Sequence, residues 1–337
     1  MRVATALVAL IGLLAPCTAD AQTQSPPLIA DLGKCSLIGG GTLEGCRIAY
    51  RTFGKKEAGG ANAILMPTWL RGTSTGWIQY LGSDRIIDTT QYFVVVVDAL
   101  GDGQSSSPSN SPNKPFPSIS IEDMVASQYR LAREFLGLTH LRAVVGYSMG
   151  GIQAFEWAAA YPNFVDRFVS IEGSPQVTRH DHAWLITQAR IIDAALMHGL
   201  PLDTVFRILG GINVLINSTQ EAINRVPRPQ ADSLINATAT NMSRNPFLAD
   251  WAAQDRAIIA YDFARRPGAD SSSVARLKGR FLVIASLDDR IISADPALSF
   301  ARRIGADTVV IPSSCGHGVI GCETPMIGRV IRAFLRR

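Results

Sequence analysis

The sequence predicts an α/β fold: a mostly parallel, doubly wound sheet with a helical insertion that forms a lid. Three observations predict it. Short apolar runs alternate with helical patterns along the chain. A serine flanked by glycines stands between one of these runs and a helical pattern. The alternation then stops for about 90 residues before it resumes, and so long an interruption indicates an insertion with structure of its own.

The composition excludes two other classes of protein. Of the 337 residues, 47% are hydrophobic and 18% are charged, whereas a disordered chain has low hydrophobicity and high net charge. The formal net charge is +4, and the basic residues form no block of the kind that binds nucleic acid. We therefore expect a folded protein that does not bind nucleic acid.

The first residues predict an export signal, at residues 1–21. Arg2 precedes an apolar run over residues 3–14, and Ala19-Asp20-Ala21 has the small side chains that signal peptidase accepts. The apolar run is too short to cross a bilayer, which needs about 20 residues. We expect cleavage after Ala21, a periplasmic or secreted product, and no membrane span in the mature chain.

Four cysteines remain in the predicted mature chain, and an even number in an oxidising compartment predicts disulfides. Three pairings are possible. Proximity favours Cys35 with Cys46, which flank a glycine turn between two short strand-like runs, and Cys315 with Cys322. Each bridge would close a short loop. Because it restricts the unfolded chain, it would stabilise the folded protein by about 2.5 to 3 kcal/mol.

Six apolar runs predict the buried strands, because each is too short for a helix and most are rich in β-branched residues. They cover residues 63–66, 92–97, 141–145, 168–171, 281–285 and 308–311. Ser120 and Asp123 form a capping-box signature, and apolar residues then recur at helical spacing until Gly137. Strand and helix thus alternate, which favours parallel pairing.

The predicted lid covers residues 174–267, which are mainly helical in pattern and contain no comparable strand run. A connection of this length inside a doubly wound sheet indicates a helical insertion above the sheet. The core is therefore expected in two parts, residues 22–173 and residues 268–337.

Ser148 is the predicted nucleophile. It lies in Gly146-Tyr147-Ser148-Met149-Gly150, between the run 141–145 and a helical pattern. In that context a tight strand-to-helix turn lifts the hydroxyl out of the sheet edge. Residues 72–76 match the same spacing, but the preceding strand ends too early and no helical pattern starts at Thr75. We interpret this second match as a glycine-rich loop.

A serine hydroxyl needs a base to take its proton and an acid to orient that base. On this architecture they follow in the order serine, acid, histidine. Of the five histidines, only His317 lies in a loop just after the last strand run. Asp288 and Asp289 follow the run 281–285. We favour Asp289, although the sequence leaves open which of the two points inward.

Two backbone N–H groups should bind the oxyanion. One belongs to Met149, after the nucleophile, and the other to Trp69 or Leu70, after the first apolar run. Arg190 lies in a mainly apolar helical stretch. It is either a surface arginine or a group that binds a substrate carboxylate in the pocket.

His180 and His182 do not predict a metal site. Side chains two residues apart diverge on a helix, and no cluster of further ligands is evident nearby. We expect a solvated lid entrance there, no metal and no cofactor.

Several motifs together resemble one known family. They are CRIAYRTFG at residues 46–54, PTW at 67–69, VDALG at 97–101, SSSPSN at 105–110, and GYSMGG at 146–151 with Gln153 and Trp157. This combination resembles the homoserine O-acetyltransferase-like branch of the α/β-hydrolase superfamily. The resemblance implies an α/β-hydrolase fold, a triad of Ser148, Asp289 and His317, and an acyl-serine intermediate.

Two departures favour water as the acceptor. Transferases of that family commonly carry an aspartate directly after the catalytic histidine, where this chain has Gly318. Acetyl-CoA and homoserine are cytoplasmic, whereas this chain resembles an exported protein. We predict an exported serine hydrolase that acts on a carboxylic ester or related small-molecule acyl substrate. The alternatives are an acyltransferase of the homoserine O-acetyltransferase type and a non-catalytic binding protein on a hydrolase scaffold.

Overall fold

The computed structural model describes residues 25–266, 277 and 280–337. The predicted export signal lies outside these residues, as do residues 267–276, where the predicted lid ends and the second part of the core begins. Within the described residues, none of the helices has both the length and the apolar composition that a membrane span requires.

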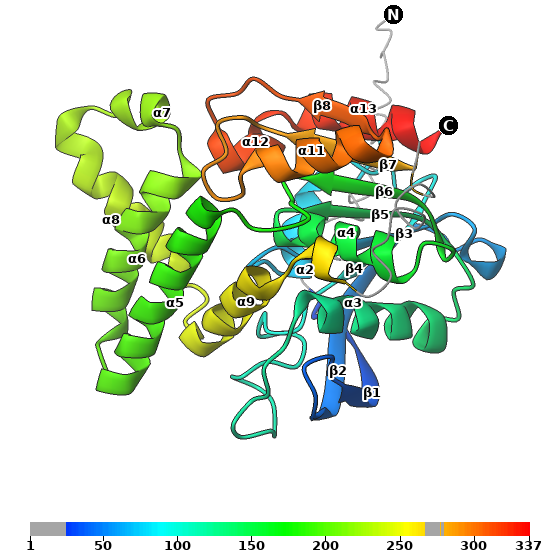
Figure 1. Cartoon of the computed structure of the whole chain (residues 1–337), viewed down its shortest axis with the longest axis horizontal. Helices are drawn as coiled ribbons and strands as arrows, with labels where there is room; N and C mark the ends of the chain where they lie inside the picture. The colour runs from blue at the N-terminus through cyan, green and yellow to red at the C-terminus, as the bar shows by residue number, and fades with distance from the viewer. Residues whose placement is uncertain (1–24, 267–276, 278–279) are drawn as a thin grey trace, which may run out of the picture.

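An eight-stranded sheet forms the centre of the molecule (Figure 1). Its order is β1-β2-β4-β3-β5-β6-β7-β8; β1, β2 and β4 pair antiparallel, and the remaining neighbours pair parallel. The strands are β1 (Leu28–Ser36), β2 (Thr42–Phe53), β3 (Ala63–Pro67), β4 (Phe93–Val97), β5 (Leu141–Tyr147), β6 (Val165–Ile171), β7 (Phe281–Ala285) and β8 (Asp307–Val310). The predicted mostly parallel α/β sheet is confirmed.

All six predicted apolar runs form strands. In β3, β4 and β7 every residue is buried, because helices cover both faces of the parallel sheet. At the other end of the sheet, β1 and β2 form an antiparallel hairpin of 9 and 12 residues, longer than the short strand-like runs that the sequence shows. Cys35 and Cys46 form a disulfide across this hairpin.

Most of the helices lie in the connections between strands, and the last two follow β8. The helices are α2 (Ser74–Trp77), α3 (Ile121–Arg130), α4 (Met149–Ala160), α5 (Arg179–His198), α6 (Leu202–Asn217), α7 (Gln220–Asn224), α8 (Ala231–Met242), α9 (Leu248–Ala260), α11 (Ala294–Ile304), α12 (Val319–Cys322) and α13 (Thr324–Leu335). The predicted capping box of Ser120 and Asp123 begins α3. The last turn of this segment is a π-helix, Leu131–Phe135, and Gly137 follows it at φ 64°.

One local expectation is wrong. Residues 72–76 are not a loop throughout, since the short helix α2 begins at Ser74. The two glycines instead make room for an aromatic ring: a Cβ on Gly72 would lie 2.6 Å from the indole of Trp69, and one on Gly76 would lie 2.7 Å from it. This segment therefore packs around Trp69, and it lacks the strand-to-helix turn that a nucleophile requires.

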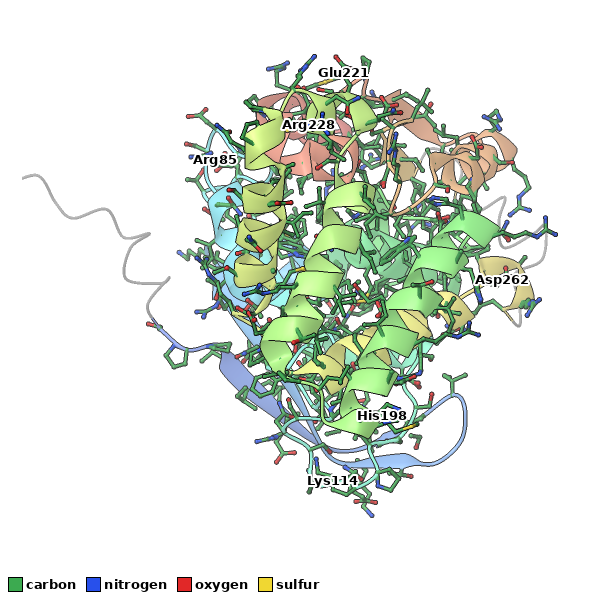
Figure 2. The ribbon with its side chains drawn as sticks, turned by 90° about the vertical axis from the view of Figure 1, so that its left-hand side faces the viewer. Arg85, Lys114, His198, Glu221, Arg228 and Asp262 are labelled. Atoms are coloured by element: carbon green, nitrogen blue, oxygen red, sulfur yellow. A yellow bond between two sulfur atoms is a disulfide. The ribbon has the colours of Figure 1, made fainter. Side chains whose placement is uncertain are left out.

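The connection between β6 and β7 contains α5 to α9, which we call the lid helices. They lie beyond the carboxyl ends of the parallel strands (Figure 1). The face in Figure 2 shows α8, α6 and α5 beside one another, with His198 at the end of α5. Ile192, Leu209 and Trp251 belong to a small apolar core within this layer. The lid helices thus cover the sheet edge at which parallel α/β folds bind their ligands.

Candidate active site

The turn between β5 and α4 holds Ser148 in a strained conformation, with φ 56° and ψ −124°. Its amide donates to the carbonyl of Ile171 on the neighbouring strand, at 2.9 Å. The turn is too tight for side chains on either side: a Cβ on Gly146 would lie 1.9 Å from the Gly150 oxygen, and one on Gly150 would lie 2.6 Å from the Pro67 oxygen. The glycines are therefore required sterically, and the serine hydroxyl stands at the carboxyl edge of the sheet.

Ser148, His317 and Asp289 form one hydrogen-bonded chain. The Ser148 Oγ lies 2.8 Å from His317 Nε2, and His317 Nδ1 lies 2.7 Å from Asp289 Oδ2. The other carboxyl oxygen of Asp289 accepts the amides of Ile291 and Ile292, at 2.8 and 3.0 Å. This arrangement can move a proton from the serine to the histidine and can stabilise the imidazolium that results.

The structure distinguishes the two neighbouring aspartates that the sequence left open. Asp289 is buried and points to His317, whereas Asp288 is exposed. In the turn after β7, two backbone amides also donate to the Asp289 carboxylate, and these bonds fix the orientation of the carboxylate. Only Asp289 can therefore orient the imidazole.

The loop that carries His317 is held at three points. His317 lies in a single 3₁₀ turn, Gly316–Gly318, and the hydroxyl of Tyr147 donates to its carbonyl oxygen at 2.7 Å. Gly316 has φ 55°, and a Cβ there would meet the Asn217 carbonyl oxygen at 3.0 Å. The Cys315–Cys322 disulfide, present as predicted, closes the loop around the histidine. The imidazole thus has a fixed place beside the nucleophile.

The predicted oxyanion donors lie around the same hydroxyl. Met149 is the first residue of α4, and Trp69 and Leu70 follow β3 and line the cavity at Ser148. Among the residues that the structure describes, no acceptor takes the amides of these three residues. The next amide, of Arg71, already donates to Gln254 Oε1 at 2.8 Å. Met149 and either Trp69 or Leu70 can therefore offer free N–H groups to developing negative charge.

A cavity of about 200 Å³ opens above the nucleophile. The sheet loops and the lid helices line it together: Trp69, Leu70, Arg71, Tyr147, Ser148, Trp184, Asn213, Asn217, Ile291 and His317. Trp184 belongs to α5, and Asn213 and Asn217 belong to α6. A small acyl compound fits this volume, and the lid helices contribute both apolar and amide groups to its walls.

Sequence reasoning missed Glu172, a second carboxyl group beside His317. It is buried with φ 48°, and its Oε2 lies 4.0 Å from His317 Nδ1. Neither carboxyl oxygen has a hydrogen-bond partner among the described residues. Burial, and then the charge of Asp289, raise the pKa of Glu172 well above its usual value. An acid directly after β6, at the carboxyl edge of the sheet, is the signal that could have identified it.

Glu172, Asp289 and His317 are also the one group of metal-ligand type among the described residues. His317 Nδ1, the ring nitrogen on the side of the two acids, is already hydrogen-bonded to Asp289. A metal ion on that nitrogen would have to replace the hydrogen bond from His317 to Asp289.

Arg190, the residue considered for carboxylate binding, is not brought to the cavity. It is exposed on α5, whereas its neighbours Gln188 and Ala189 form the buried face of that helix. Of the two alternatives that the sequence left open, its position favours the surface arginine, because the helix turns this residue outward.

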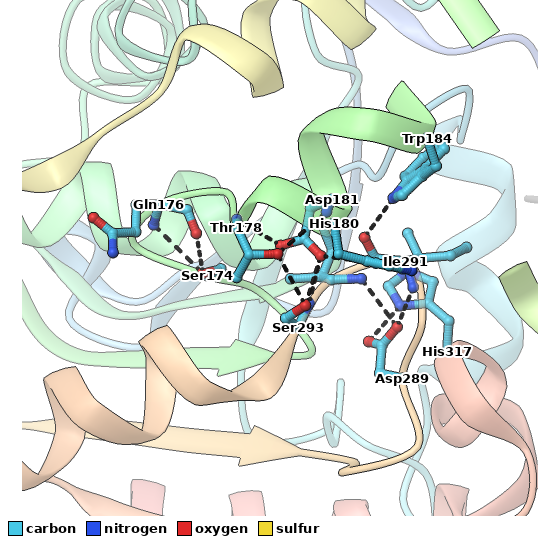
Figure 3. A network of polar contacts seen from close by, with 11 residues as sticks. Ser174, Gln176, Thr178, His180, Asp181, Trp184, Asp289, Ile291, Ser293 and His317 are labelled. Carbon is cyan, nitrogen blue, oxygen red and sulfur yellow. Dashed lines mark hydrogen bonds and ion pairs between the residues drawn. The ribbon is translucent and has the colours of Figure 1, made fainter. Parts of the chain in front are cut away.

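The start of α5 does not form a metal site either. His180 and His182 are exposed, while Asp181 between them is fully buried and caps the helix with Thr178. The Asp181 Oδ1 also accepts the amide and the hydroxyl of Ser293, at 3.1 and 2.7 Å (Figure 3). Asp181 therefore anchors the start of α5, and with it the lid helices, to the loop that follows Asp289.

Comparisons with known proteins agree with this fold. Residues 69–321 match the family model described as the alpha/beta hydrolase fold. A probable esterase of Corynebacterium glutamicum is 38% identical over 180 residues, which cover 52% of each chain; the match thus spans about half the length of that relative. A homoserine O-acetyltransferase of Clavibacter michiganensis is 29% identical and covers 91% of this chain and 92% of its own.

The solved structure of an acetylester hydrolase from Corynebacterium glutamicum has a TM-score of 0.83 and 26% identity, and the match covers 96% of this chain and 100% of that one. The predicted resemblance to homoserine O-acetyltransferases is thus confirmed, and esterases resemble the chain as well. The strand-to-helix turn at Ser148, the sheet order and the family match lead to one conclusion: this chain belongs to the alpha/beta hydrolase fold family.

Proposed function

We propose that this protein is an exported serine hydrolase that cleaves a carboxylic ester through an acyl-serine intermediate. The observation that carries the proposal is the hydrogen-bonded chain from Ser148 through His317 to Asp289, which ends in a cavity of about 200 Å³. Esterases and an acyltransferase among the similar proteins support an acyl ester as the substrate class.

In the first half of the reaction, His317 Nε2 takes the proton of Ser148 Oγ while the oxygen attacks the ester carbonyl carbon. The tetrahedral oxyanion is bound by the amide of Met149 and by that of Trp69 or Leu70. The C–O bond to the alcohol then breaks, and the imidazolium returns the proton to the leaving alkoxide. Ser148 remains acylated, and Asp289 stabilises the positive imidazolium throughout.

In the second half, the alcohol leaves and a water molecule takes its place. His317 accepts one proton of that water, and the oxygen attacks the acyl carbon. The collapse of the second tetrahedral intermediate breaks the bond to Ser148 Oγ, which regains its proton from His317. The products are one carboxylic acid and one alcohol, and the enzyme returns to its starting state.

Two features favour water over an amine-bearing acceptor. Gly318 follows His317, where the resembling transferases commonly have an aspartate. The disulfides Cys35–Cys46 and Cys315–Cys322 support an oxidising compartment outside the cytoplasm, where acetyl-CoA is made and used. The first candidate substrates are therefore simple acetyl esters, which the name of the similar hydrolase structure also suggests.

The test is an assay of the purified protein with ethyl acetate as ester and with water or homoserine as acceptor. We expect acetate release, its loss in Ser148→Ala, and labelling of Ser148 by a fluorophosphonate probe. Transfer of acetyl from acetyl-CoA to homoserine at a rate above hydrolysis would favour the acyltransferase. If Ser148 is not labelled and neither activity is found, the result would favour a non-catalytic binding protein on a hydrolase scaffold.

Export has its own test. The N-terminal residue of the protein recovered from the periplasm or medium of the producing cells is expected to be Gln22. Recovery of the full chain from the cytoplasm, with free thiols, would contradict this part of the proposal.

A further inference from the structure

A partly buried arginine lies beside the nucleophile, and among the described residues no carboxylate forms an ion pair with it. Arg71 follows β3 by four residues, in a turn closed by the amide of Gly72 on the carbonyl of Trp69 at 2.9 Å. Its backbone is left-handed, with φ 62°. That conformation is uncommon for a residue with a side chain, so the surrounding structure holds it in place. The turn directs Arg71 into the wall of the cavity that contains Ser148 and His317.

The guanidinium is held by packing and not by an ion pair. Its Cζ lies 4.4 Å from the ring centroid of Trp251 on α9, at cation–π distance. The Nε is shielded from solvent and has no hydrogen-bond acceptor among the described residues. Within the described residues, no carboxylate lies within ion-pair distance of the terminal nitrogens of Arg71. A buried charge without a hydrogen-bonded partner is costly and is normally compensated.

The acid whose charge acts on Arg71 is only a partial counter-ion. Asp255 of α9 turns both carboxyl oxygens to Gln188 Nε2, at 3.0 and 2.9 Å. Burial raises the pKa of Asp255 to about 7, so near neutral pH it carries only part of a negative charge. Burial also lowers the pKa of Arg71, although an arginine remains charged at that pH. The guanidinium therefore still lacks a full anionic partner.

Arg71 lines two cavities. The second, of about 210 Å³, shares Trp69, Leu70, Arg71 and Asn213 with the cavity at Ser148. Its remaining lining comes mainly from α8 and the residues around it: Thr238, Asn241, Met242, Asn245 and Trp251. Amide and hydroxyl side chains thus make up much of the lining of this second cavity, together with Arg71. This lining suits a polar, negatively charged group better than an alkyl chain.

We propose that Arg71 binds a carboxylate of the substrate, so that the preferred substrate is an ester that bears a carboxylate a few bonds from the bond that is cleaved. This inference rests on the proposed esterase function and names its substrate class. A guanidinium pairs with a carboxylate through two parallel N–H···O bonds, which fix orientation as well as add affinity. Because Arg71 lines both cavities, the second can hold the anion while the first holds the reacting ester at Ser148.

The kinetic test compares esters that differ only in charge. Monoethyl glutarate against ethyl pentanoate places the carboxylate on the acyl side, and 3-acetoxypropanoate against propyl acetate places it on the alcohol side. We expect at least one anionic ester to have the higher kcat/KM. In Arg71→Met its preference over the neutral ester should fall by about tenfold or more, the effect of losing a charged hydrogen-bond partner. Arg71→Lys should restore part of the preference.

Arg190→Met is the matched control, because Arg190 is exposed on α5 and lines neither cavity. Its preference for the anionic ester should equal that of the wild-type protein. A purely structural Arg71, needed only to pack against Trp251, would give equal losses on both esters together with a lower melting temperature. That result, or an unchanged ratio in Arg71→Met, overturns the proposal.

A binding measurement separates this inference from the esterase function itself. In the Ser148→Ala background, calorimetry should show tighter binding of the anionic ester than of its neutral partner, and Arg71→Met should remove the difference. If the wild-type protein cleaves no ester but this difference is present, the proposed function fails and the anion site remains. If esters are cleaved without any such difference in turnover or binding, the anion site fails alone.

Discussion

The indole Nε1 of Trp184 donates a hydrogen bond of 2.8 Å to the carbonyl oxygen of Ile291 (Figure 3). The amide of the same Ile291 donates to Asp289 Oδ1 at 2.8 Å. Ile291 thus contacts the lid helix α5 through its carbonyl group and orients Asp289 through its amide group. The position of the lid helices and the orientation of the acid are therefore coupled through two hydrogen bonds.

Trp184→Phe tests this coupling. Phenylalanine keeps most of the apolar volume but removes the donor, which leaves the Ile291 carbonyl unpaired and loosens the acid loop. We expect kcat to fall by up to about tenfold, the usual effect of one hydrogen bond, with the fold retained by circular dichroism. Thr187→Ala, on the exposed side of the same helix, is the control and should leave kcat unchanged. An unaltered kcat in Trp184→Phe would show that the lid does not support the acid.

The two neighbouring aspartates provide a matched pair for the triad. Asp289→Asn keeps the shape of the side chain but removes the charge that stabilises the imidazolium, so we expect kcat to fall by about 10⁴-fold. Asp288→Asn changes an exposed side chain and should leave kcat within about twofold. Steady-state ester hydrolysis by both variants decides the assignment, and the reverse pattern would exchange their roles.

Glu172→Gln should have little effect on hydrolysis near pH 7. Burial raises the pKa of Glu172 well above its usual value and so favours the neutral carboxyl, and glutamine has nearly the same shape as the neutral acid. We expect kcat/KM within about twofold of the wild-type value. A large loss would show that an ionised Glu172 takes part in the reaction.

The same substitution should change stability in a pH-dependent way. A carboxyl whose folded pKa is raised favours the folded state fully below its unfolded pKa of 4.5, and this contribution is lost as the pH rises from there through the folded pKa. Compared with wild type, Glu172→Gln should therefore have a similar melting temperature near pH 4 and a rising advantage above pH 4.5. Exposed Glu57→Gln is the control, and a constant difference across this range would contradict the expectation.

The two disulfides should differ in their effect on catalysis. Both close short loops, of sequence separation 11 and 7, so replacing either pair by serines should destabilise the protein by about 2 to 3 kcal/mol. Cys315–Cys322 brackets His317, and its loss should also lower kcat at temperatures where the protein remains folded. Removal of Cys35–Cys46, in the β1–β2 hairpin, should leave kcat unchanged. Equal kinetics in the two variants would separate the His317 loop from its disulfide.

Local signals were sufficient for much of the architecture. The six apolar runs became strands because burial on both faces requires continuous apolar sequence, which can be read without tertiary information. The turn at Ser148 was recognisable since its glycines are imposed by contacts with the next few residues and the adjoining strand. The segment 72–76 has the same spacing without the same context, and it packs around Trp69 instead.

Positions that depend on which way a side chain points were less accessible. Arg190 lies in an apolar-looking helix, but the helix turns it to solvent. Glu172 and Arg71 gave no motif, because their surroundings come from segments far away in the chain: His317 for the first, and Trp251 and Asp255 for the second. A local sequence pattern cannot predict a contact between residues that are about 150 positions or more apart in the chain.

The alternation of strands with helices, the nucleophile and its histidine follow from the sequence alone, since burial, turn geometry and chain order act over short stretches of the chain or on its overall sequence of elements. The choice of Asp289 over Asp288, the raised pKa of Glu172 and the place of Arg71 against Trp251 were decided only by the tertiary structure. Each of these depends on desolvation and on neighbours brought together by folding, and those energies exist only once the distant segments are in contact.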